Sequence, residues 1–170
     1  MDPAANLVLT GMPGCGKSTI GALVARLLGR RFVDTDKLVV SKSAMGIPEI
    51  FERFGEARFR ELERQVAEEM STCSELVIAT GGGTIVQDGA PEIFRRNGVI
   101  CYLRRPLELL QTAHGRPLSQ TRAAVEKLYE LRREKYERAA DFTVDNVDAV
   151  PEEVAKLIVD EFERRIKCGP

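Results

Sequence analysis

Short apolar runs alternate with longer amphipathic stretches along the 170 residues of the chain. The apolar runs that suit buried strands lie at residues 6–10, 32–34, 76–79, 99–103 and 142–144. Apolar residues recur with helical spacing between them, at 18–28, 47–54, 56–70, 91–96, 106–112 and 122–139, and a last helix is expected from about residue 151. Apolar strands that are each followed by a helix are typical of a parallel sheet covered on both faces. The pattern predicts one α/β domain of three layers around a five-stranded parallel sheet.

The overall charge argues against a protein that binds nucleic-acid phosphates. Lys and Arg total 25 against 26 Asp and Glu, which gives a net charge of −1 and an isoelectric point near 6.0. A nucleic-acid partner would favour a basic excess. The sequence also lacks an apolar stretch of membrane-spanning length and a recognisable signal peptide, so no membrane partner is expected.

The cysteine and histidine content excludes two classes of catalytic site. The cysteines Cys15, Cys73, Cys101 and Cys168 are far apart in the chain, and we interpret them as free thiols in a reducing cytoplasm. His114 is the single histidine, so a histidine-based zinc site or a Ser-His-Asp triad would be hard to assemble.

The sequence GMPGCGKS at 11–18 fits the phosphate-binding pattern G-x-x-x-x-G-K-[ST] in full. It follows a predicted strand and opens a predicted helix, which is where a P-loop needs to lie. Lys17 would reach the β- and γ-phosphates of a nucleotide, and the Ser18 hydroxyl would bind Mg²⁺. The predicted phosphate-binding residues are Gly14, Cys15, Gly16, Lys17, Ser18 and Thr19.

A P-loop alone does not define a reaction, so the rest of the chain must discriminate. The chain has no Asn-Lys-x-Asp motif for guanine, and LVIATGGG at 76–83 carries no acid where a motor ATPase would place one. The remaining candidates are Asp34 and Asp36, beyond the second predicted strand. One carboxylate could hold Mg²⁺ waters while the next accepts a hydrogen bond from an acceptor hydroxyl. The alternative is that Asp36 only caps the following helix.

A set of motifs in matching order resembles the shikimate kinase family. The motifs are GMPGCGKSTIG at 11–21, FVDTD at 32–36, GIPEIFERFGEARFRELE at 46–63, TGGG at 80–83, RPL at 116–118 and Arg-x-x-x-Tyr at 132–136. The resemblance covers almost the whole chain. It implies a single P-loop kinase domain with a substrate-binding helical segment at about 36–72 and a lid at about 111–121.

The resemblance also implies roles in phosphoryl transfer. Ser18 would bind Mg²⁺ directly and Asp34 through a water molecule, beside Lys17 on the phosphates of ATP. Asp36 matches the carboxylate that binds shikimate hydroxyls and takes the proton from the attacking one. Arg116 matches the lid arginine that closes on the transferring phosphates.

Shikimate itself would be bound by residues from three further segments. Arg60 and Arg132 match the arginines that hold the shikimate carboxylate, and Gly82 matches the glycine whose backbone N–H meets the substrate. Arginine forks suit such a task because they bind carboxylates in a bidentate way. Two alternatives remain open here: Arg60 could form only a surface helix pair with Glu63, and Arg133 could serve in place of Arg132.

The sequence therefore favours an ATP-dependent kinase that phosphorylates the 3-hydroxyl of shikimate, with Mg²⁺ as cofactor. A kinase for another small hydroxylated metabolite, such as gluconate, is a second hypothesis. A nucleotide-sensing relative without catalysis is a third, although the joint presence of Lys17, Ser18, Asp34, Asp36 and Arg116 speaks against it. No feature demands an interface, so a monomer is expected.

Overall fold

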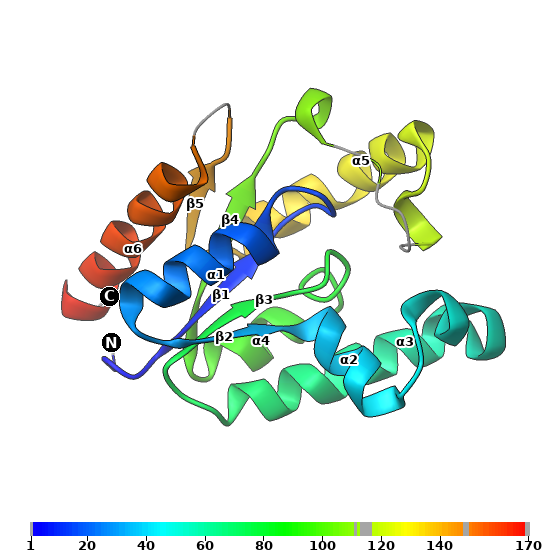
Figure 1. Cartoon of the computed structure of the whole chain (residues 1–170), viewed down its shortest axis with the longest axis horizontal. Coiled ribbons are helices and arrows are strands. Elements are labelled where there is room, and N and C mark those ends of the chain that lie inside the picture. Colours follow the sequence, from blue (N-terminus) through cyan, green and yellow to red (C-terminus); the bar gives the residue numbers. More distant parts are fainter. Residues whose placement is uncertain (1, 111, 113–116, 148–149, 169–170) are drawn as a thin grey trace.

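The computed structural model describes residues 2–110, 112, 117–147 and 150–168. Its strands form one parallel sheet in the order β2-β3-β1-β4-β5 (Figure 1). The strand bounds are Asn6–Thr10 for β1, Arg31–Asp34 for β2, Leu76–Ala79 for β3, Gly98–Arg104 for β4 and Phe142–Asp145 for β5. The predicted five-stranded parallel sheet is confirmed.

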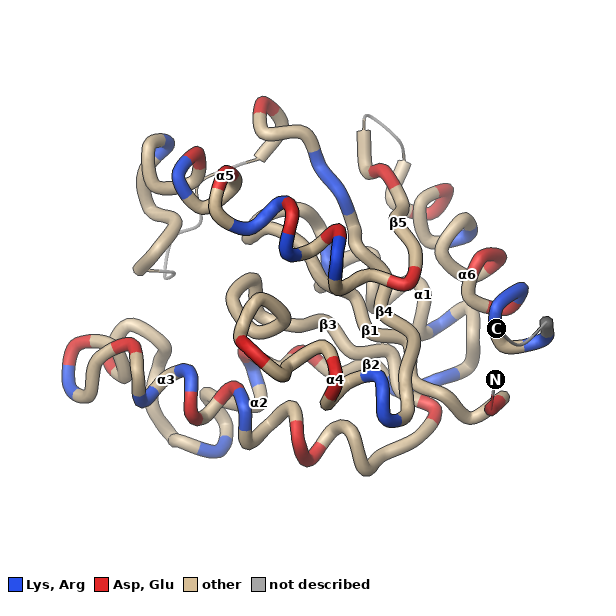
Figure 2. Tube along the Cα trace, turned by 180° about the vertical axis from the view of Figure 1, so that it is seen from behind, with Lys and Arg blue, Asp and Glu red and all other residues tan. Residues whose placement is uncertain are grey.

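Helices cover both faces of this sheet. On one face lie α1 (Lys17–Leu28) and α6 (Pro151–Cys168), which pack against each other. On the other lie α4 (Ala90–Arg95), α5 (Arg122–Ala139) and the second half of α3 (Ile47–Ser71), as the opposite views of Figures 1 and 2 show. The two helices predicted at 47–54 and 56–70 form the two parts of α3, which break at Gly55 with φ 78° and ψ 176°. The three predicted layers are present.

Two local predictions need correction. The predicted element ranges left out the helix after β2, although a helical segment from about residue 36 was expected there; α2 spans Thr35–Ser43. Its N-cap is Asp34, whose side chain accepts from the Lys37 amide at 3.3 Å, and not Asp36. The predicted helix at 106–112 is wrong, because only a short 3₁₀ helix, η1 (Leu107–Leu109), forms there and Leu110 is already extended. A second short 3₁₀ helix, η2, spans Pro117–Ser119.

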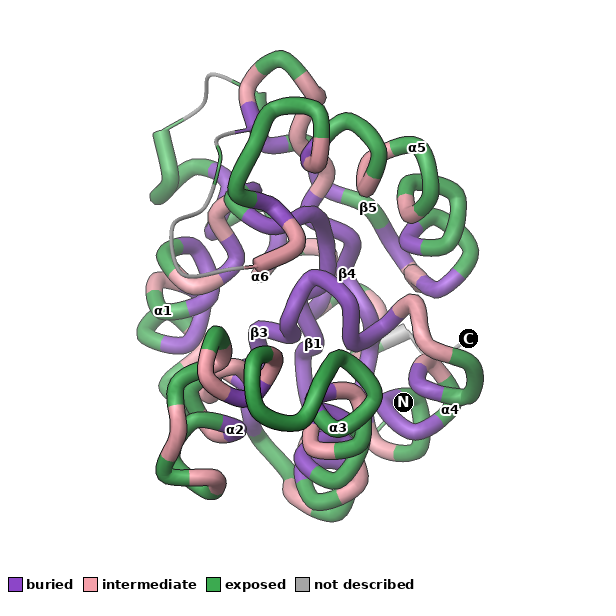
Figure 3. Tube along the Cα trace, turned by 90° about the vertical axis from the view of Figure 1, so that its right-hand side faces the viewer, coloured by how far each residue is buried: buried purple, intermediate pink, exposed green. Residues whose placement is uncertain are grey.

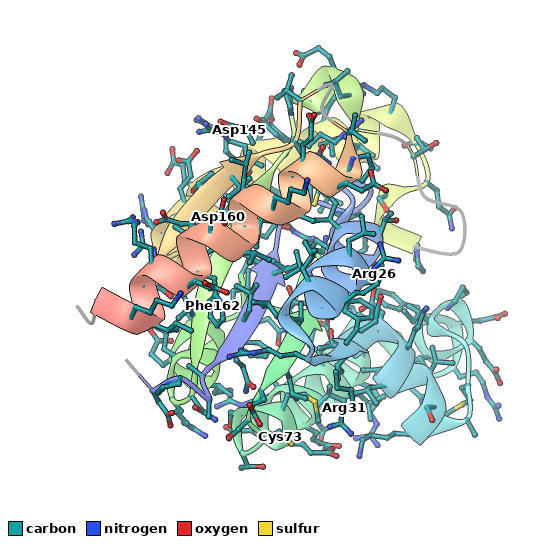
Figure 4. The ribbon with its side chains drawn as sticks, turned by 60° about the vertical axis from the view of Figure 1, so that its left-hand side comes forward. Arg26, Arg31, Cys73, Asp145, Asp160 and Phe162 are labelled. Atoms are coloured by element: carbon teal, nitrogen blue, oxygen red, sulfur yellow. The ribbon has the colours of Figure 1, made fainter. Side chains whose placement is uncertain are left out.

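The core lies on both sides of the three central strands. Figure 3 shows buried backbone along β1, β3 and β4 and exposed turns on the outer sides of the helices. Tyr136 of α5 and Phe162 of α6 are fully buried against opposite faces, with Phe162 labelled in Figure 4. Since every strand runs in the same direction, all five carboxyl ends meet at one edge, the position where open α/β sheets bind ligands.

The cysteines with described side chains are free thiols, as the sequence predicts. Cys15, Cys73 and Cys101 are free, and burial holds the pKa of Cys101 far above its ordinary value. The Cys168 side chain is not among those that the structure describes.

Within the described ranges, no helix combines the length and apolar character needed to cross a membrane.

Candidate active site

A cleft of about 370 Å³ opens at the carboxyl edge of the sheet. The phosphate loop and the start of α1 supply one wall through residues 14 and 16–19. The opposite wall comes from the ends of β2 and β3, with Asp34, Asp36 and Thr80. The fold thus brings together the loop and the two aspartates that the sequence separates by about twenty residues.

The loop is shaped for an anion by its glycines and by the helix that follows. Gly16 takes a left-handed conformation, φ 103°, as the N-cap of α1 and offers no side chain to the first amides of the helix. These N–H groups and the helix dipole favour negative charge at this point. Asn146, directly after β5, braces the loop by donating from Nδ2 to the Cys15 carbonyl at 2.9 Å. Sequence reasoning missed Asn146 because 131 residues separate the two groups.

Lys17 is held inside the loop. Its ammonium donates to the carbonyl oxygens of Gly11 and Met12, both at 2.9 Å, and the residue is 6% exposed. The Cys15 thiol lies 3.7 Å from the same ammonium and is completely buried, so it takes no part in lining the cleft. The loop therefore keeps a positive charge partly desolvated at the place where phosphates would bind.

The Ser18 hydroxyl donates to Asp34 Oδ2 at 2.7 Å. A hydroxyl and a carboxylate side by side are hard oxygen ligands, and Mg²⁺ in phosphate sites commonly takes one or two such protein ligands while waters and phosphates complete its shell. Over the described part of the chain, no cluster of three or more Asp, Glu, His or Cys side chains forms a complete protein-based metal site. The residues present fit an ion shared with a nucleotide.

A second, smaller pocket adjoins the cleft. Asp36, Arg60, Glu63, Gly82 and Arg132 supply most of its polar lining, and further side chains of the phosphate loop, α3, η2 and α5 complete it. These polar residues come from α2, α3, the loop after β3, and α5. Asp36 lines both spaces, so it marks the junction between the cleft and the pocket.

Arg60 is fixed by acids on its own helix. Its guanidinium donates from Nη1 to Glu63 Oε2 at 2.6 Å and from Nη2 to Glu56 Oε1 at 2.7 Å. Burial alone would lower the pKa of Arg60, but the pairing with Glu63 and Glu56 outweighs it and raises that pKa. Because Glu63 is only 1% exposed, this contact is not the surface helix pair considered as an alternative.

Glu63 is a site residue that sequence reasoning treated only as a possible surface partner. Its carboxylate also accepts from Thr84 Oγ1 at 2.6 Å and from Gln87 Nε2 at 2.9 Å. Burial raises the pKa of Glu63, an effect that Arg60 and Thr84 partly offset. The sequence signal for this residue was its place three positions after Arg60 in a highly charged helix. That spacing predicts a pair but does not reveal that Glu63 is buried.

The glycines after β3 allow charged side chains to approach the backbone. A Cβ atom built on Gly83 would lie 2.7 Å from Arg60 Cζ, and one on Gly81 would lie 2.7 Å from Glu63 Oε1. Real Cβ atoms do not show such contacts, so a side chain at Gly81 or Gly83 would force the charged groups of the pocket to shift.

The two candidate arginines of α5 differ in position. Arg132 lines the pocket and donates from Nη1 to the Gly82 carbonyl at 3.1 Å. Arg133 is half-exposed and lies 3.8 Å from Glu137 on the outer surface. Arg116 and His114 lie outside the described residues, as does part of the predicted lid at 111–121.

An acceptor held in the pocket would lie beside phosphates held in the cleft, because Asp36 borders both. Together with the five-stranded parallel sheet, this arrangement defines a P-loop kinase that acts on a small molecule. The family model described as shikimate kinase matches residues 13–163. The chain belongs to the shikimate kinase family.

Individual relatives agree with this assignment. The shikimate kinase of Thermodesulfovibrio yellowstonii is 40% identical over 166 residues, which cover 94% of this chain and 95% of the relative. The structure of shikimate kinase from Acinetobacter baumannii in complex with shikimate has a TM-score of 0.90 at 34% identity, covering 95% of this chain and 94% of the other. A gluconokinase from Sinorhizobium meliloti has a TM-score of 0.67 at 16% identity, which shows a shared fold alone.

Proposed function

We propose that this protein transfers the γ-phosphoryl group of ATP to the 3-hydroxyl of shikimate, forming shikimate 3-phosphate and ADP on the route to chorismate and the aromatic amino acids. The observation that carries the proposal is the position of Asp36 between the phosphate-binding cleft and the arginine-lined pocket. A hydroxyl bound at Asp36 would lie at the border between the pocket and the cleft that would hold the phosphates. The family membership and the shikimate complex of the Acinetobacter relative support this acceptor.

The pocket binds the acceptor through opposite charge and fixed geometry. Arg60 and Arg132 together hold the shikimate carboxylate, for which guanidinium forks are well matched. The Gly82 backbone N–H and the Asp36 carboxylate hold ring hydroxyls. Since Glu63 and Glu56 already restrain Arg60, the acceptor orders few additional side chains when it binds.

The loop binds the phosphates on the other side of Asp36. Lys17 exchanges its carbonyl partners for phosphate oxygens, and the loop amides of residues 14–19 surround the β-phosphate. Ser18 would hold Mg²⁺ directly and Asp34 would hold it through water, and the ion would neutralise charge on the phosphates. Arg116 completes the predicted set as the residue that closes on the transferring group.

Asp36 acts at the reacting hydroxyl. It accepts the proton as the hydroxyl oxygen forms its bond to the γ-phosphorus, while the bond from that phosphorus to the leaving ADP oxygen breaks. Positioning and charge neutralisation supply most of the acceleration in such a transfer, which asks little covalent chemistry of the protein.

The proposal also covers the parts of the domain, the cellular location and the oligomeric state. Residues 36–72, which are largely helical here, serve as the substrate-binding segment, and 111–121 serve as the lid of a single P-loop kinase domain. We place the protein in the cytoplasm as a monomer. Size-exclusion chromatography with light scattering tests the monomer, since a dimer would double the mass of 18.9 kDa.

An ADP-release assay with Mg-ATP tests the reaction. Shikimate, gluconate, nucleoside monophosphates and no acceptor are compared at equal concentration. Strong stimulation by shikimate alone is expected, because both arginines and Asp36 suit a hydroxylated acid. Stimulation by gluconate instead would keep the kinase and replace the acceptor, and no stimulation by any of them, with ATP binding demonstrated separately, would favour the sensing relative.

A further inference from the structure

The peptide between Gly82 and Gly83 is held from several directions at the centre of the site. Its carbonyl accepts from the Tyr136 hydroxyl and, at 3.1 Å, from Arg132 Nη1. On the other side Gly82 packs against the phosphate loop, where an added Cβ would lie 2.8 Å from Pro13 Cδ. Gly83 in turn lies against the Arg60 guanidinium. This peptide therefore separates the two arginines of the acceptor pocket.

Neither glycine can hold that peptide by itself. Glycine has no side chain to restrict rotation about its backbone bonds, so the orientation of the peptide depends on its partners. Arg132 is a poor permanent partner, because the proposed acceptor site requires its guanidinium for a carboxylate. When Arg132 turns to the acceptor, Tyr136 is the one donor that the described residues still offer to the buried carbonyl.

Tyr136 is itself rigidly held. It lies one turn after Arg132 on α5, is fully buried, and stacks on Tyr102 of β4 with ring centroids 5.2 Å apart and an interplanar angle of 26°. Burial holds the pKa of the Tyr136 phenol far above its ordinary value, so the hydroxyl remains a donor throughout the working pH range.

We infer that Tyr136 is a positioning residue for the acceptor: its hydroxyl fixes the Gly82–Gly83 peptide between Arg60 and Arg132 and leaves Arg132 free to bind the shikimate carboxylate. The inference rests on the proposed function and adds a residue to its acceptor site. Tyr136 touches no reacting atom; it acts through the glycine backbone and through its side-chain hydrogen bond with Arg132.

Tyr102 provides a matched control. Its hydroxyl is also buried, but it has no hydrogen-bond partner in the described part of the chain. Tyr136→Phe and Tyr102→Phe each remove one hydroxyl from the same stacked pair and leave both rings in place. A general effect of removing a phenol from this core would appear in both variants, whereas an effect on the acceptor site would appear only in Tyr136→Phe.

The test measures the two variants and the wild type as full-length protein. Titration calorimetry gives the affinities for shikimate and for ADP, steady-state kinetics give kcat and the two KM values, and thermal melts give Tm. We expect Tyr136→Phe to weaken shikimate affinity and raise its KM by roughly three- to ten-fold, the worth of one buried hydrogen bond. ADP affinity stays within about two-fold in both variants, and Tyr102→Phe leaves shikimate affinity unchanged.

Hydrogen exchange adds a readout that does not depend on the acceptor. The amides of residues 81–84 should exchange faster in Tyr136→Phe than in Tyr102→Phe, because the peptide has lost a restraint. Equal shikimate affinity in the two variants would overturn the inference, even if Tyr136→Phe melts at a lower temperature. A parallel loss of ADP affinity would overturn it as well, since the effect would then be general. Wild-type protein that binds ADP but not shikimate would instead refute the proposed function, and the inference with it.

Discussion

The phosphate loop and the acceptor pocket lie side by side but are built differently. The loop is made from consecutive residues, and its charged group, Lys17, bonds to carbonyls five and six positions away. The pocket takes its charged residues and Gly82 from four separate segments, and its contacts join residues such as Glu63 and Thr84 or Arg132 and Gly82, 21 and 50 positions apart. The phosphates of ATP, a substrate that many kinases share, are thus assigned to a contiguous motif. The site for the acceptor, which distinguishes one kinase from another, is created by tertiary packing.

The two regions also differ in electrostatics. In the pocket, burial and ion pairing shift the pKa values of Glu63 and Arg60, and the guanidinium is oriented before any acceptor arrives. In the loop, the orienting partners of Lys17 are neutral backbone carbonyls. We therefore expect substitutions in the loop to reduce catalysis and substitutions in the pocket to reduce acceptor affinity.

The largest effect is expected from Lys17→Met, which removes the buried positive charge from the loop and keeps much of the side chain's volume. Loss of one charge-stabilising group of this kind should lower kcat by about 10³-fold. Shikimate affinity, measured by calorimetry, should stay within about two-fold because the pocket is untouched. A comparable loss of shikimate affinity would show that the two regions are not separable.

Asp36→Asn tests the junction between the loop and the pocket. Because Asp36 borders both, we expect this substitution to reduce catalysis and acceptor affinity together. The amide keeps the shape of the side chain but cannot take a proton, so kcat should fall by about 10²-fold, the typical worth of a general base. Shikimate binding should weaken as well, since the charge that faces its hydroxyls is lost. Single-turnover kinetics with ADP binding as control would separate the two effects, and a variant with normal turnover would remove Asp36 from the reaction.

Gly83→Ala should affect the pocket alone. The added methyl group would collide with the Arg60 guanidinium, so Arg60 must move away from Glu63. We expect a rise of roughly ten-fold in the KM for shikimate, the cost of a charge-assisted hydrogen bond lost by displacement, with the KM for ATP unchanged. Gly46→Ala is the control, because a Cβ there meets only Pro48 Cδ at 3.8 Å and the residue has an ordinary φ of −68°.

The smallest effect concerns stability and pH. Because burial raises the pKa of Glu63 in the folded protein, the ionised carboxylate opposes folding at neutral pH. As the pH falls through the folded pKa towards the unfolded value, the native state takes up the proton first and this group's contribution becomes more favourable. The free energy of unfolding of wild type relative to Glu63→Gln should therefore increase from pH 7 to pH 4 in urea titrations. A decrease would mean that pairing with Arg60 outweighs burial.

The same contrast explains which features the sequence could predict. The strands and the loop follow from local patterns, and the order of the motifs was sufficient for the family. The helix α2 carries the run Leu38, Val39 and Val40, whose apolar spacing is weakly amphipathic, and the predicted helix at 106–112 ends after one 3₁₀ turn. The Asp34 cap starts α2 locally, whereas bonds from Arg122 to the Leu107 and Leu110 carbonyls hold the segment of η1 from outside.

The supporting residues of the site were harder to foresee. Glu63 and Tyr136 lie within the family motifs but carry no local sign of their role, and Asn146 lies in no motif. Each acts through a partner that is distant in the sequence and is brought near by folding. Their common property is burial of a polar group with its hydrogen bonds satisfied, which only the three-dimensional arrangement reveals.

The bond from Asn146 to the Cys15 carbonyl has a consequence for biosynthesis. Asn146 follows Cys15 by 131 residues in the chain, so the ribosome makes the phosphate loop long before it makes the residue that braces it. The central strand β1 likewise waits for β3 and β4 before either of its edges is paired. A nascent chain that stops before β5 would therefore carry a complete phosphate-binding motif without a supported loop, and we expect nucleotide binding to begin only after β5 and Asn146 have been made.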